Sequence, residues 1–288
     1  MVDLGRGAPQ GVQPDPIAGT AEAVRNAIVL DGVSFSYPGG VRALGQLTLS
    51  IASNRVTGIA GPSGCGKSTM LYLLAGLYRP EGGKILWQTE PGASASGRHP
   101  LAMVFQKDTL LPWLTVSENV GFSFTFNRID QAEAKSRVDW LLEMVGLSEF
   151  AKAYPYQLSG GMRRRVAFLT AVAPFPSVLL LDEPFSSLDE PTRVAIHQDV
   201  LTIIREMRMT VVLVTHDLGE AISLCDEVAI LTRRPGSVAS RYEIPFGAER
   251  NILDLRQGRL FLELYGQLWR ELSRQLEPGS KRSGARDR

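Results

Sequence analysis

The order of apolar and polar residues along the chain predicts strands that alternate with helices. Apolar runs that read as strands span residues 28–36, 44–51, 56–60, 84–87, 101–105, 177–184, 211–215 and 227–232. Several of these runs are apolar almost throughout, as strands in a buried parallel sheet are. The alternation from residue 56 to residue 232 therefore indicates an α/β fold, in which helices pack on a mostly parallel sheet.

Two further segments carry helical signals. Asp130 followed by Glu133 has the spacing of a capping box, and residues 132–145 continue as an amphipathic helix that stops at Gly146. Near the C-terminus an apolar residue recurs at every fourth position, at Leu260, Leu264, Leu268 and Leu272. We expect one apolar stripe there, packed against the domain or a partner.

Composition divides the chain into four parts. Residues 1–26 are rich in Gly, Pro and Ala and read as a flexible lead-in. We expect the folded domain over residues 27–245 and a helical extension over residues 246–276. Residues 277–288 are polar and basic. We interpret them as a disordered tail, with binding to acidic lipid headgroups as the alternative.

The overall composition is that of a globular chain with a sizeable core. The chain has 288 residues, of which 44% are hydrophobic and 21% charged, and its net charge is +1. This length allows one large domain or two small ones. A near-neutral charge gives no reason to expect nucleic-acid binding. No apolar run approaches the roughly 20 residues that cross a bilayer, and the first residues lack the apolar core of a signal peptide, so we expect a cytoplasmic protein.

The cysteines and two of the histidines are expected to be structural or solvated. Cys65 and Cys225 lack the paired spacing of a disulfide framework or a metal site, so both read as small buried side chains. His99 falls in a loop rich in Gly, Ser and Pro, and His197 in an expected helix.

The clearest chemical signal is the sequence GPSGCGKST, which follows the run 56–60 and precedes a helical run at residues 69–77. The pattern G-x-x-x-x-G-K-[ST] between a strand and a helix predicts a phosphate-binding loop rather than an ordinary Gly-rich turn. Its glycines let backbone N–H groups turn inward, and the helix start adds about half a positive charge. Lys67 is expected to meet the β- and γ-phosphates, and Ser68 to offer its hydroxyl to Mg²⁺. The candidate nucleotide-binding residues of the loop are Gly61, Pro62, Ser63, Gly64, Cys65, Gly66, Lys67, Ser68 and Thr69.

Polar side chains stand at the ends of three other apolar runs. Asp182 and Glu183 close one run, His216 follows another, and Gln106 follows a third. Asp182 is suited to hold Mg²⁺ through water, whereas Glu183 points elsewhere and can orient or deprotonate a water molecule. Gln106 can reach Mg²⁺ or the water with its carbonyl oxygen, and His216 can hydrogen-bond a γ-phosphate or the water. Solvated strand ends or surface residues are the plain alternative for each.

Other features leave two interpretations open. Tyr37 lies at a turn, where it either stacks on a nucleotide base or caps the sheet. The segment LLPWLTV, residues 110–116, is either a local core patch or an exposed docking surface. The segment LSGGM, residues 158–162, is either an anion-binding nest at a helix start or one more turn.

Residues 163–165 are all Arg, but consecutive helical residues point about 100° apart. We interpret them as mixed surface and phosphate-proximal groups rather than a nucleic-acid patch.

The order of these motifs resembles that of the ATP-binding cassette (ABC) ATPases, over about residues 27–240. Few other proteins with a phosphate-binding loop carry LSGG just before the strand that ends in the carboxylates. The resemblance implies a P-loop NTPase core with a mostly parallel sheet, an antiparallel β subdomain and a helical signature subdomain at about residues 107–172.

The resemblance also implies a role for each motif residue. Tyr37 corresponds to the adenine-stacking aromatic, residues 61–69 to Walker A, and Gln106 to the Q-loop residue. The remaining correspondences are Ser159, Gly160 and Gly161 with the signature motif, Asp182 and Glu183 with Walker B and the catalytic glutamate, Asp189 with the D-loop aspartate, and His216 with the switch histidine. Implied metal-site residues are Ser68, Gln106 and Asp182, and the implied cofactors are ATP and Mg²⁺.

In this family two cassettes close head to tail, so that the signature of one completes the phosphate site of the other. The resemblance therefore implies a homodimer or a paired ABC subunit, docked at the cytoplasmic face of a membrane on transmembrane permease subunits. A narrower likeness, in TLLPWLTVSENV and LTRRPG, is to the ATPase subunits of nitrate, sulfonate and taurine importers. It implies a solute-binding protein as a further partner, and the near-neutral charge argues against nucleic acid as one. Two departures are present. Thr170 stands where the family usually has Arg in the helix after the signature, and residues 237–246 fit the pattern of the importer branch only loosely.

Three other functions compete with an importer. A soluble ABC ATPase of DNA repair or translation usually carries two cassettes or long coiled coils, and this chain has one cassette and no sustained heptads. A small-molecule kinase would leave LSGGM unexplained. An exporter subunit stays open, because the membrane partner sets the direction of transport.

Overall fold

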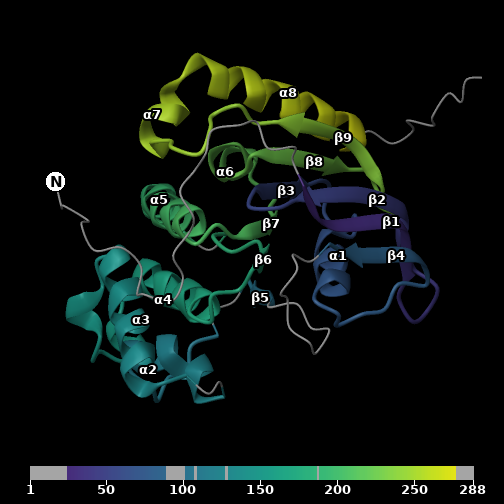
Figure 1. The fold of residues 1–288 in the computed structure, drawn as a ribbon. Helices are drawn as coiled ribbons and strands as arrows, with labels where there is room; N and C mark the ends of the chain where they lie inside the picture. The colour runs from purple at the N-terminus through teal and green to yellow at the C-terminus, as the bar shows by residue number, and fades with distance from the viewer. Residues whose placement is uncertain (1–24, 89–100, 107–108, 127–128, 187, 277–288) are drawn as a thin grey trace, which may run out of the picture.

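The computed structural model describes residues 25–88, 101–106, 109–126, 129–186 and 188–276. The predicted lead-in, except for its last two residues, and the predicted tail at residues 277–288 lie outside the described residues, as does His99. The described residues form a central sheet with helices on both sides, a smaller sheet at one end and a helical lobe at the other (Figure 1). The predicted division of the chain at residues 245 and 246 stays a prediction.

The central sheet has six strands in the order β5-β6-β7-β3-β8-β9. Its first five strands are parallel, and β9 pairs antiparallel with β8 at the edge. Their bounds are β3 Val56–Ala60, β5 Leu101–Val104, β6 Val178–Asp182, β7 Thr210–Val214, β8 Glu227–Leu231 and β9 Val238–Glu243. All but β9 match runs that the sequence predicts as strands, so the mostly parallel sheet is confirmed.

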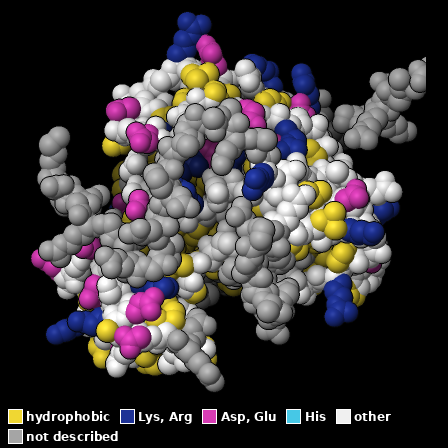
Figure 2. Space-filling view, viewed as in Figure 1, with side chains coloured by type: hydrophobic (Ala, Val, Ile, Leu, Met, Phe, Trp, Pro, Cys, Tyr) yellow, Lys and Arg dark blue, Asp and Glu magenta, His cyan; other side chains and the backbone are white. Residues whose placement is uncertain are grey.

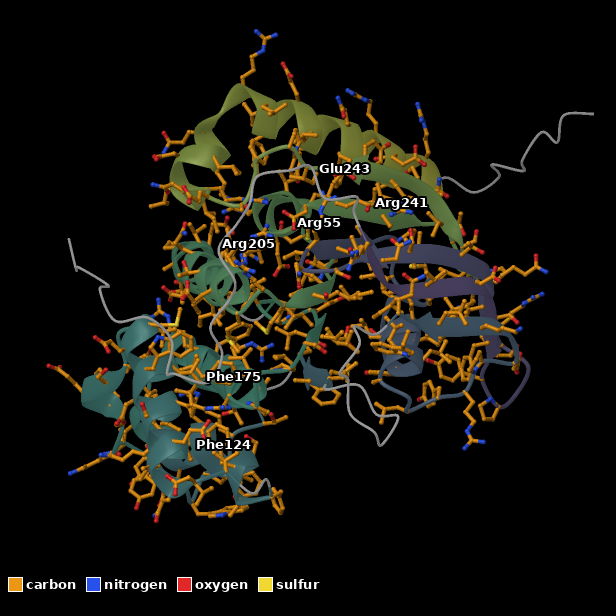
Figure 3. The ribbon with its side chains drawn as sticks, viewed as in Figure 1. Arg55, Phe124, Phe175, Arg205, Arg241 and Glu243 are labelled. Carbon is orange, nitrogen blue, oxygen red and sulfur yellow. The ribbon has the colours of Figure 1, made fainter. Side chains whose placement is uncertain are left out.

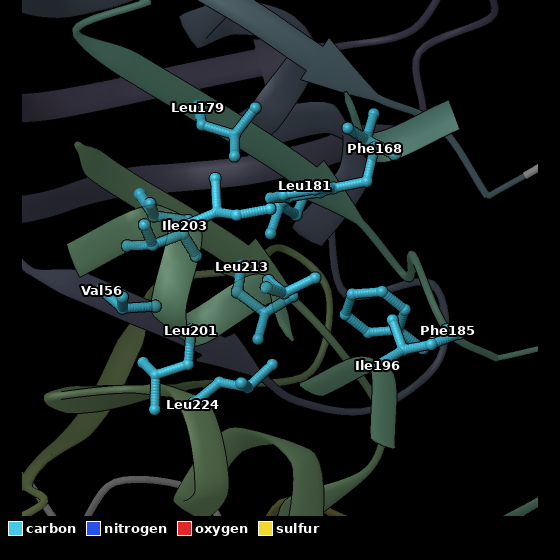
Figure 4. Packing of buried hydrophobic residues seen from close by; sticks show 14 of the residues in the cluster. Val56, Phe168, Leu179, Leu181, Phe185, Ile196, Leu201, Ile203, Leu213 and Leu224 are labelled. Atoms are coloured by element: carbon cyan, nitrogen blue, oxygen red, sulfur yellow. The ribbon is translucent and has the colours of Figure 1, made fainter. Parts of the chain in front are cut away.

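Alternation within the buried strands divides the interior into two hydrophobic clusters. Leu179 and Leu181 of β6 join the cluster that also contains residues of α4, α5 and α6, whereas Leu180 joins the cluster that contains residues of β1, β2 and α1. Successive side chains of a strand point to opposite faces, so one apolar strand supplies both clusters. Figure 4 shows Leu181 with Leu213 of β7 and Leu201 of α5 in the first cluster.

The smaller sheet is antiparallel, with the order β2-β1-β4. Its strands are β1 Asn26–Ser36, β2 Arg42–Ala52 and β4 Gly82–Trp87, and α1 Lys67–Leu74 lies next to it (Figure 1). The turn between β1 and β2 contains Gly39 and Gly40, with φ of 100° and 82°. Residues with a Cβ rarely adopt such angles, which accounts for the paired glycines. The antiparallel β subdomain implied by the sequence is therefore present.

The helical lobe lies between β5 and β6 in the sequence. It consists of α2 Val116–Gly121, η1 Phe122–Thr125, α3 Gln131–Met144, η2 Ser148–Phe150, η3 Pro155–Gln157 and α4 Gly160–Val172. Asp130 caps α3, accepting hydrogen bonds from the backbone N–H of Ala132 and Glu133, and the chain turns at Gly146 with φ 67°. The helix predicted at residues 132–145 is thus confirmed with Asp130 as its cap, whereas the Glu133 side chain pairs with Arg137 instead of completing the capping box.

The remaining helices are α5 Glu190–Glu206, α6 Leu218–Leu224, α7 Ile252–Gln257 and α8 Arg259–Leu276. On α8, Leu264 and Leu268 are buried and Leu272 is partly buried, but Leu260 is 41% exposed and Phe261 is buried in its place. The prediction for Leu260 was wrong because a four-residue step advances about 400° around a helix, so a stripe of that spacing drifts off the buried face.

Ion pairs join the C-terminal strands to the rest of the sheet. Arg55 pairs with Glu243 at 2.7 Å, and Arg241 and Arg205 bind Glu227 and Asp226. Figure 3 labels both partners of the first pair.

On the face in Figure 2 cationic and anionic side chains are interspersed, in keeping with the net charge of +1. Among the helices of the described residues, none combines the length and apolar character needed to cross a membrane.

Candidate functional site

The strand order brings the predicted site residues to one edge of the central sheet. Gln106 follows β5, Asp182 ends β6, His216 follows β7, and the phosphate-binding loop follows β3; these four strands are consecutive neighbours. Within the sheet, Asp182 is level with Val214, and Val214 is level with Ile59. Carboxyl ends of neighbouring parallel strands form the crevice in which α/β proteins bind ligands.

The phosphate-binding loop needs its glycines. Gly64 and Gly66 have φ of 72° and 107°. A Cβ on Gly66 would lie 2.7 Å from the Leu44 side chain and 2.9 Å from the carbonyl oxygen of Ala43, so the loop packs too closely on β2 for any side chain. Gly66 is also the N-cap residue of α1, and the free N–H groups of the helix start are turned toward the loop.

Lys67 holds its charge inside this loop. Its side chain is buried, and Nζ donates to the carbonyl oxygens of Gly61 at 2.9 Å and Pro62 at 3.1 Å. A buried ammonium group with only neutral partners is a strong site for an anion. The predicted phosphate contact of Lys67 is compatible with this position.

Ser68 and Asp182 meet beside the loop. The Ser68 hydroxyl donates to Oδ1 of Asp182 at 2.9 Å, and Tyr72 donates to Oδ2 at 3.4 Å. Burial raises the pKa of Asp182, while the hydrogen bond from Ser68 lowers it. A buried carboxylate beside a hydroxyl group offers the oxygen ligands that Mg²⁺ prefers, so the donor set fits that ion.

Glu183 and His216 form a second pair at the same edge. Nδ1 of His216 lies 3.0 Å from Oε2 of Glu183, and the backbone N–H of Glu183 donates to the Val214 carbonyl at 2.9 Å. Glu183 has φ 46°, a left-handed conformation that costs about 1–2 kcal/mol in a residue other than glycine. This backbone turn separates the direction of Glu183 from that of Asp182, as the sequence predicts. A carboxylate held by an imidazole can orient a water molecule.

Gln106 and Tyr37 lie at two sides of the site. Gln106 is exposed, and its Nε2 donates to the Ser186 hydroxyl at 3.3 Å. The Tyr37 hydroxyl is 2.7 Å from the Thr69 hydroxyl, and its ring packs edge-on against Phe35. Gln106 is thus linked to the segment that follows Glu183, and Tyr37 to the end of the phosphate-binding loop.

The LSGGM segment begins α4. The Ser159 hydroxyl accepts from the Met162 backbone N–H at 3.2 Å, and both Ser159 and Gly160 are exposed. A Cβ on Gly161 would lie 2.6 Å from the Thr192 side chain, so this glycine lets α4 approach α5. In Figure 1, α4 lies in the helical lobe, on the other side of the molecule from α1.

Comparison with known proteins gives this site a family. The family model described as ABC transporter matches residues 44–186. An uncharacterized ABC transporter ATP-binding protein of Methanocaldococcus jannaschii is 40% identical over 222 residues, covering 75% of this chain and 81% of the relative. The chain belongs to the ABC transporter family. The resemblance seen in the sequence is confirmed, and the protein is an ABC ATPase.

Further matches extend over more of this cassette. The taurine import ATP-binding protein TauB of Jannaschia sp. is 34% identical and covers 87% of this chain and 94% of the relative. The structure of cbiO1 from Clostridium perfringens, part of the ABC transporter complex cbiONQ, has a TM-score of 0.70 at 26% identity, covering 85% of this chain and 99% of that one. The dimeric structure of MJ0796, a bacterial ABC transporter cassette, has a TM-score of 0.64 at 31% identity, covering 76% and 100%. The predicted fold class is confirmed.

The three consecutive arginines of the cassette have partners within the chain. Arg163 donates to the Leu158 carbonyl and Arg164 to the Phe105 carbonyl, both at 2.7 Å, and Arg165 pairs with Asp199 at 2.6 Å. Their side chains point in different directions, as predicted, but they hold helices and loops together. The expected phosphate-proximal position does not appear in these contacts. Arg164 nevertheless supports the site, because Phe105 precedes Gln106.

Several residues around the site were not singled out from the sequence. Arg234 donates from Nε to the Gly64 carbonyl at 3.0 Å and so supports the phosphate-binding loop. Beneath His216, the Thr215 hydroxyl donates to the buried carboxylate of Glu220, which faces the buried ring of His197 at 3.6 Å. His197 is therefore structural, as expected. Cys65 and Cys225 are buried free thiols, as expected, and burial raises the pKa of both.

Proposed function

We propose that two copies of this chain, or this chain and a paired ABC subunit, close head to tail on ATP and drive import of a small anionic solute through transmembrane permease subunits. The observation that carries the proposal is the meeting of two pairs at the mouth of the phosphate-binding loop, Ser68 with Asp182 and Glu183 with His216. These pairs supply the groups that phosphoryl transfer to water needs.

Each site residue has a part in this proposal. Lys67 and the backbone of residues 61–69 bind the β- and γ-phosphates, and Tyr37 stacks on the adenine base. Ser68, Asp182 and Gln106 hold Mg²⁺, which supplies charge neutralisation on the phosphate oxygens when bound. Glu183 accepts a proton from the attacking water, and His216 holds the carboxylate of Glu183 in place through the 3.0 Å contact.

A partner cassette completes the site. Ser159 and Gly160 are exposed at the start of α4, and α4 lies in the helical lobe, on the other side of the molecule from α1 (Figure 1). Such a helix start is suited to bind a γ-phosphate of the other subunit. MJ0796 supports this arrangement, because it is dimeric in one structure and also in a post-hydrolysis state bound to ADP and Pi.

The helical lobe provides a surface for a permease. Trp113 is 69% exposed and Phe126 77% exposed, and Phe126 packs edge-on against Phe122, which is also exposed. A groove of about 570 Å³ in the same lobe is lined by Leu114, Phe122 and Val138 among others. Exposed aromatic patches of this kind mark protein interaction sites. Of the two interpretations of residues 110–116, this proposal adopts docking, at the cytoplasmic face of the membrane.

The solute is proposed from the sequence motifs and one relative. The segments TLLPWLTVSENV and LTRRPG are similar to those of nitrate, sulfonate and taurine importers, and a taurine import ATP-binding protein is 34% identical over 259 residues. Importers of such solutes receive them from a solute-binding protein, which we propose as a further partner.

The test is ATP-dependent dimerisation of Glu183→Gln. This change keeps the shape of the side chain but removes the base, so ATP should bind, turnover should fall about 10²-fold or more, and a stable dimer should accumulate with ATP and Mg²⁺. Light scattering after gel filtration measures the dimer, and phosphate release measures turnover. Glu149→Gln, at an exposed position in η2, is the matched control and should behave as the unchanged protein. Ordinary turnover in Glu183→Gln would refute the assignment.

A further inference from the structure

The C-terminal helices of this chain reach the hydrolytic site through one arginine. Arg256 on α7 pairs with the carboxylate of Glu190, the first residue of α5. Glu190 directly follows Asp189, whose side chain caps α5 by accepting from the Thr192 backbone N–H at 3.3 Å. In Figure 1, α7 lies beside α5 and α6. The contact therefore joins α7 to the residue that directly follows Asp189, and both of its partners lie beyond residues 44–186, which the family model matches.

A second link continues from Glu190 to the loop of His216. Arg193, one turn further along α5, pairs with Glu190 and also with Asp217, at 3.1 Å. Asp217 follows His216 and caps α6, accepting from the Glu220 backbone N–H at 3.1 Å. Arg256, Glu190, Arg193 and Asp217 thus form a continuous chain of ion pairs that ends next to the residue that contacts Glu183.

The local packing is shaped to admit the guanidinium of Arg256. A Cβ on Gly219, in the first turn of α6, would lie 2.8 Å from Nη2 of Arg256 and 3.1 Å from Oδ1 of Asp217. The Arg256 side chain is only 18% exposed. Desolvation alone would raise the pKa of Glu190, but hydrogen bonds from Arg193 and Arg256 outweigh it and lower that pKa. One cation therefore lies against both the start of α5 and the start of α6.

We propose that Arg256 is a positioning residue for ATP hydrolysis. Through it, the C-terminal extension holds the loop of Asp189 and the loop of His216 in a fixed position relative to each other. The inference rests on the proposed function of Glu183 and His216. Arg256 touches neither of them, so it acts through Glu190 and Arg193. Without it, Arg193 is left as the cation between the start of α5 and the start of α6, and the His216–Glu183 contact becomes less well defined. Small displacements of groups that orient a reacting molecule lower the rate much more than the affinity.

The first measurement is steady-state ATPase activity of the full chain carrying Arg256→Gln. We expect kcat to fall about 3- to 30-fold while the KM for ATP and the affinity for ATP change less than about twofold, since the phosphate-binding loop is untouched. Arg259→Gln is the matched control, because Arg259 is 92% exposed and, within the described residues, pairs along its own helix with Glu263. Arg256→Lys keeps one charge near Glu190 and should recover part of the lost kcat.

A double-mutant cycle separates positioning from a general loss of stability. In a Glu190→Gln background, Arg256→Gln should lower kcat no further, since the partner is gone. Equal losses in both backgrounds, or a full kcat in Arg256→Gln, would overturn the inference. If Arg256→Gln unfolds at a lower temperature than the unchanged protein, kcat is compared between Arg256→Lys and Arg259→Lys instead. A lower kcat in Arg256→Lys alone supports the inference, and equal values overturn it. Loss of activity in His216→Ala with normal activity in Arg256→Gln would refute only this inference, whereas normal activity in His216→Ala would refute the proposed function itself.

Discussion

The imidazole of His216 lies 3.0 Å from the carboxylate of Glu183, although the two residues are 33 positions apart in the sequence. They follow neighbouring strands β7 and β6, and the left-handed backbone of Glu183 turns its side chain toward the ring. His216→Ala should therefore lower kcat about 10- to 100-fold with ATP affinity retained, because only the orientation of the base is lost. Phosphate release and nucleotide titration measure the two quantities. A matching fall in affinity would contradict this role.

Lys67→Ala should abolish or sharply weaken ATP binding. The buried ammonium group is the only side-chain cation that the described part of the phosphate-binding loop supplies. Its loss removes a charge-assisted contact from a desolvated site, which corresponds to about 1.5–3 kcal/mol or more in binding. Equilibrium binding of a fluorescent ATP analogue tests this. Lys84→Ala, at an exposed position on β4, serves as control, and unchanged affinity in Lys67→Ala would remove the phosphate-loop assignment.

Ser159→Arg should stop hydrolysis and leave nucleotide binding by the monomer near normal. Ser159 is exposed at the start of α4, so a large side chain there fits the monomer but blocks the approach of a second phosphate site. The change also removes the cap of α4, at a cost of about 1 kcal/mol. Ser159→Ala removes the cap alone and separates the two effects. Loss of ATP binding by monomeric Ser159→Arg would mean that the signature acts on its own subunit's nucleotide.

Asp182→Asn should make the nucleotide-free protein relatively more stable as the pH rises. Burial raises the pKa of the Asp182 carboxyl group in the folded state above its usual value. A carboxyl group with a raised pKa favours the folded state fully below its unfolded pKa, and this advantage is lost as pH rises through the folded pKa. The asparagine carries no such penalty, so its advantage in Tm over the unchanged protein should grow from acid pH toward neutrality. A gain confined to the acid end would contradict the pKa shift.

The same substitution should remove the response to Mg²⁺. Adding Mg²⁺ with ATP should raise the Tm of the unchanged protein, since the ion offsets the buried charge of Asp182, and should raise that of Asp182→Asn much less. Differential scanning calorimetry with and without Mg²⁺ measures both values.

Much of the fold could be predicted because its signals are local. The strands β3, β6, β7 and β8 are mostly apolar and are buried along their whole length, and each lies within two residues of its predicted bounds. The loop of residues 61–69 could be recognised because its glycines are required by backbone angles and close packing, which act within a few residues. Leu260 was misplaced because the sequence shows the spacing of a stripe but not its rotation on the core.

The sequence by itself determined which residues form strands, where the phosphate-binding loop begins, and which polar side chains end the buried strands, because these depend on short-range periodicity and backbone geometry. Only the tertiary structure decided that Ser68 meets Asp182, that Arg234 supports Gly64, and that Arg256 reaches Glu190. These pairs lie 66 to 170 positions apart. Their contacts depend on strand order and on how helices cross, which no local pattern of residues specifies.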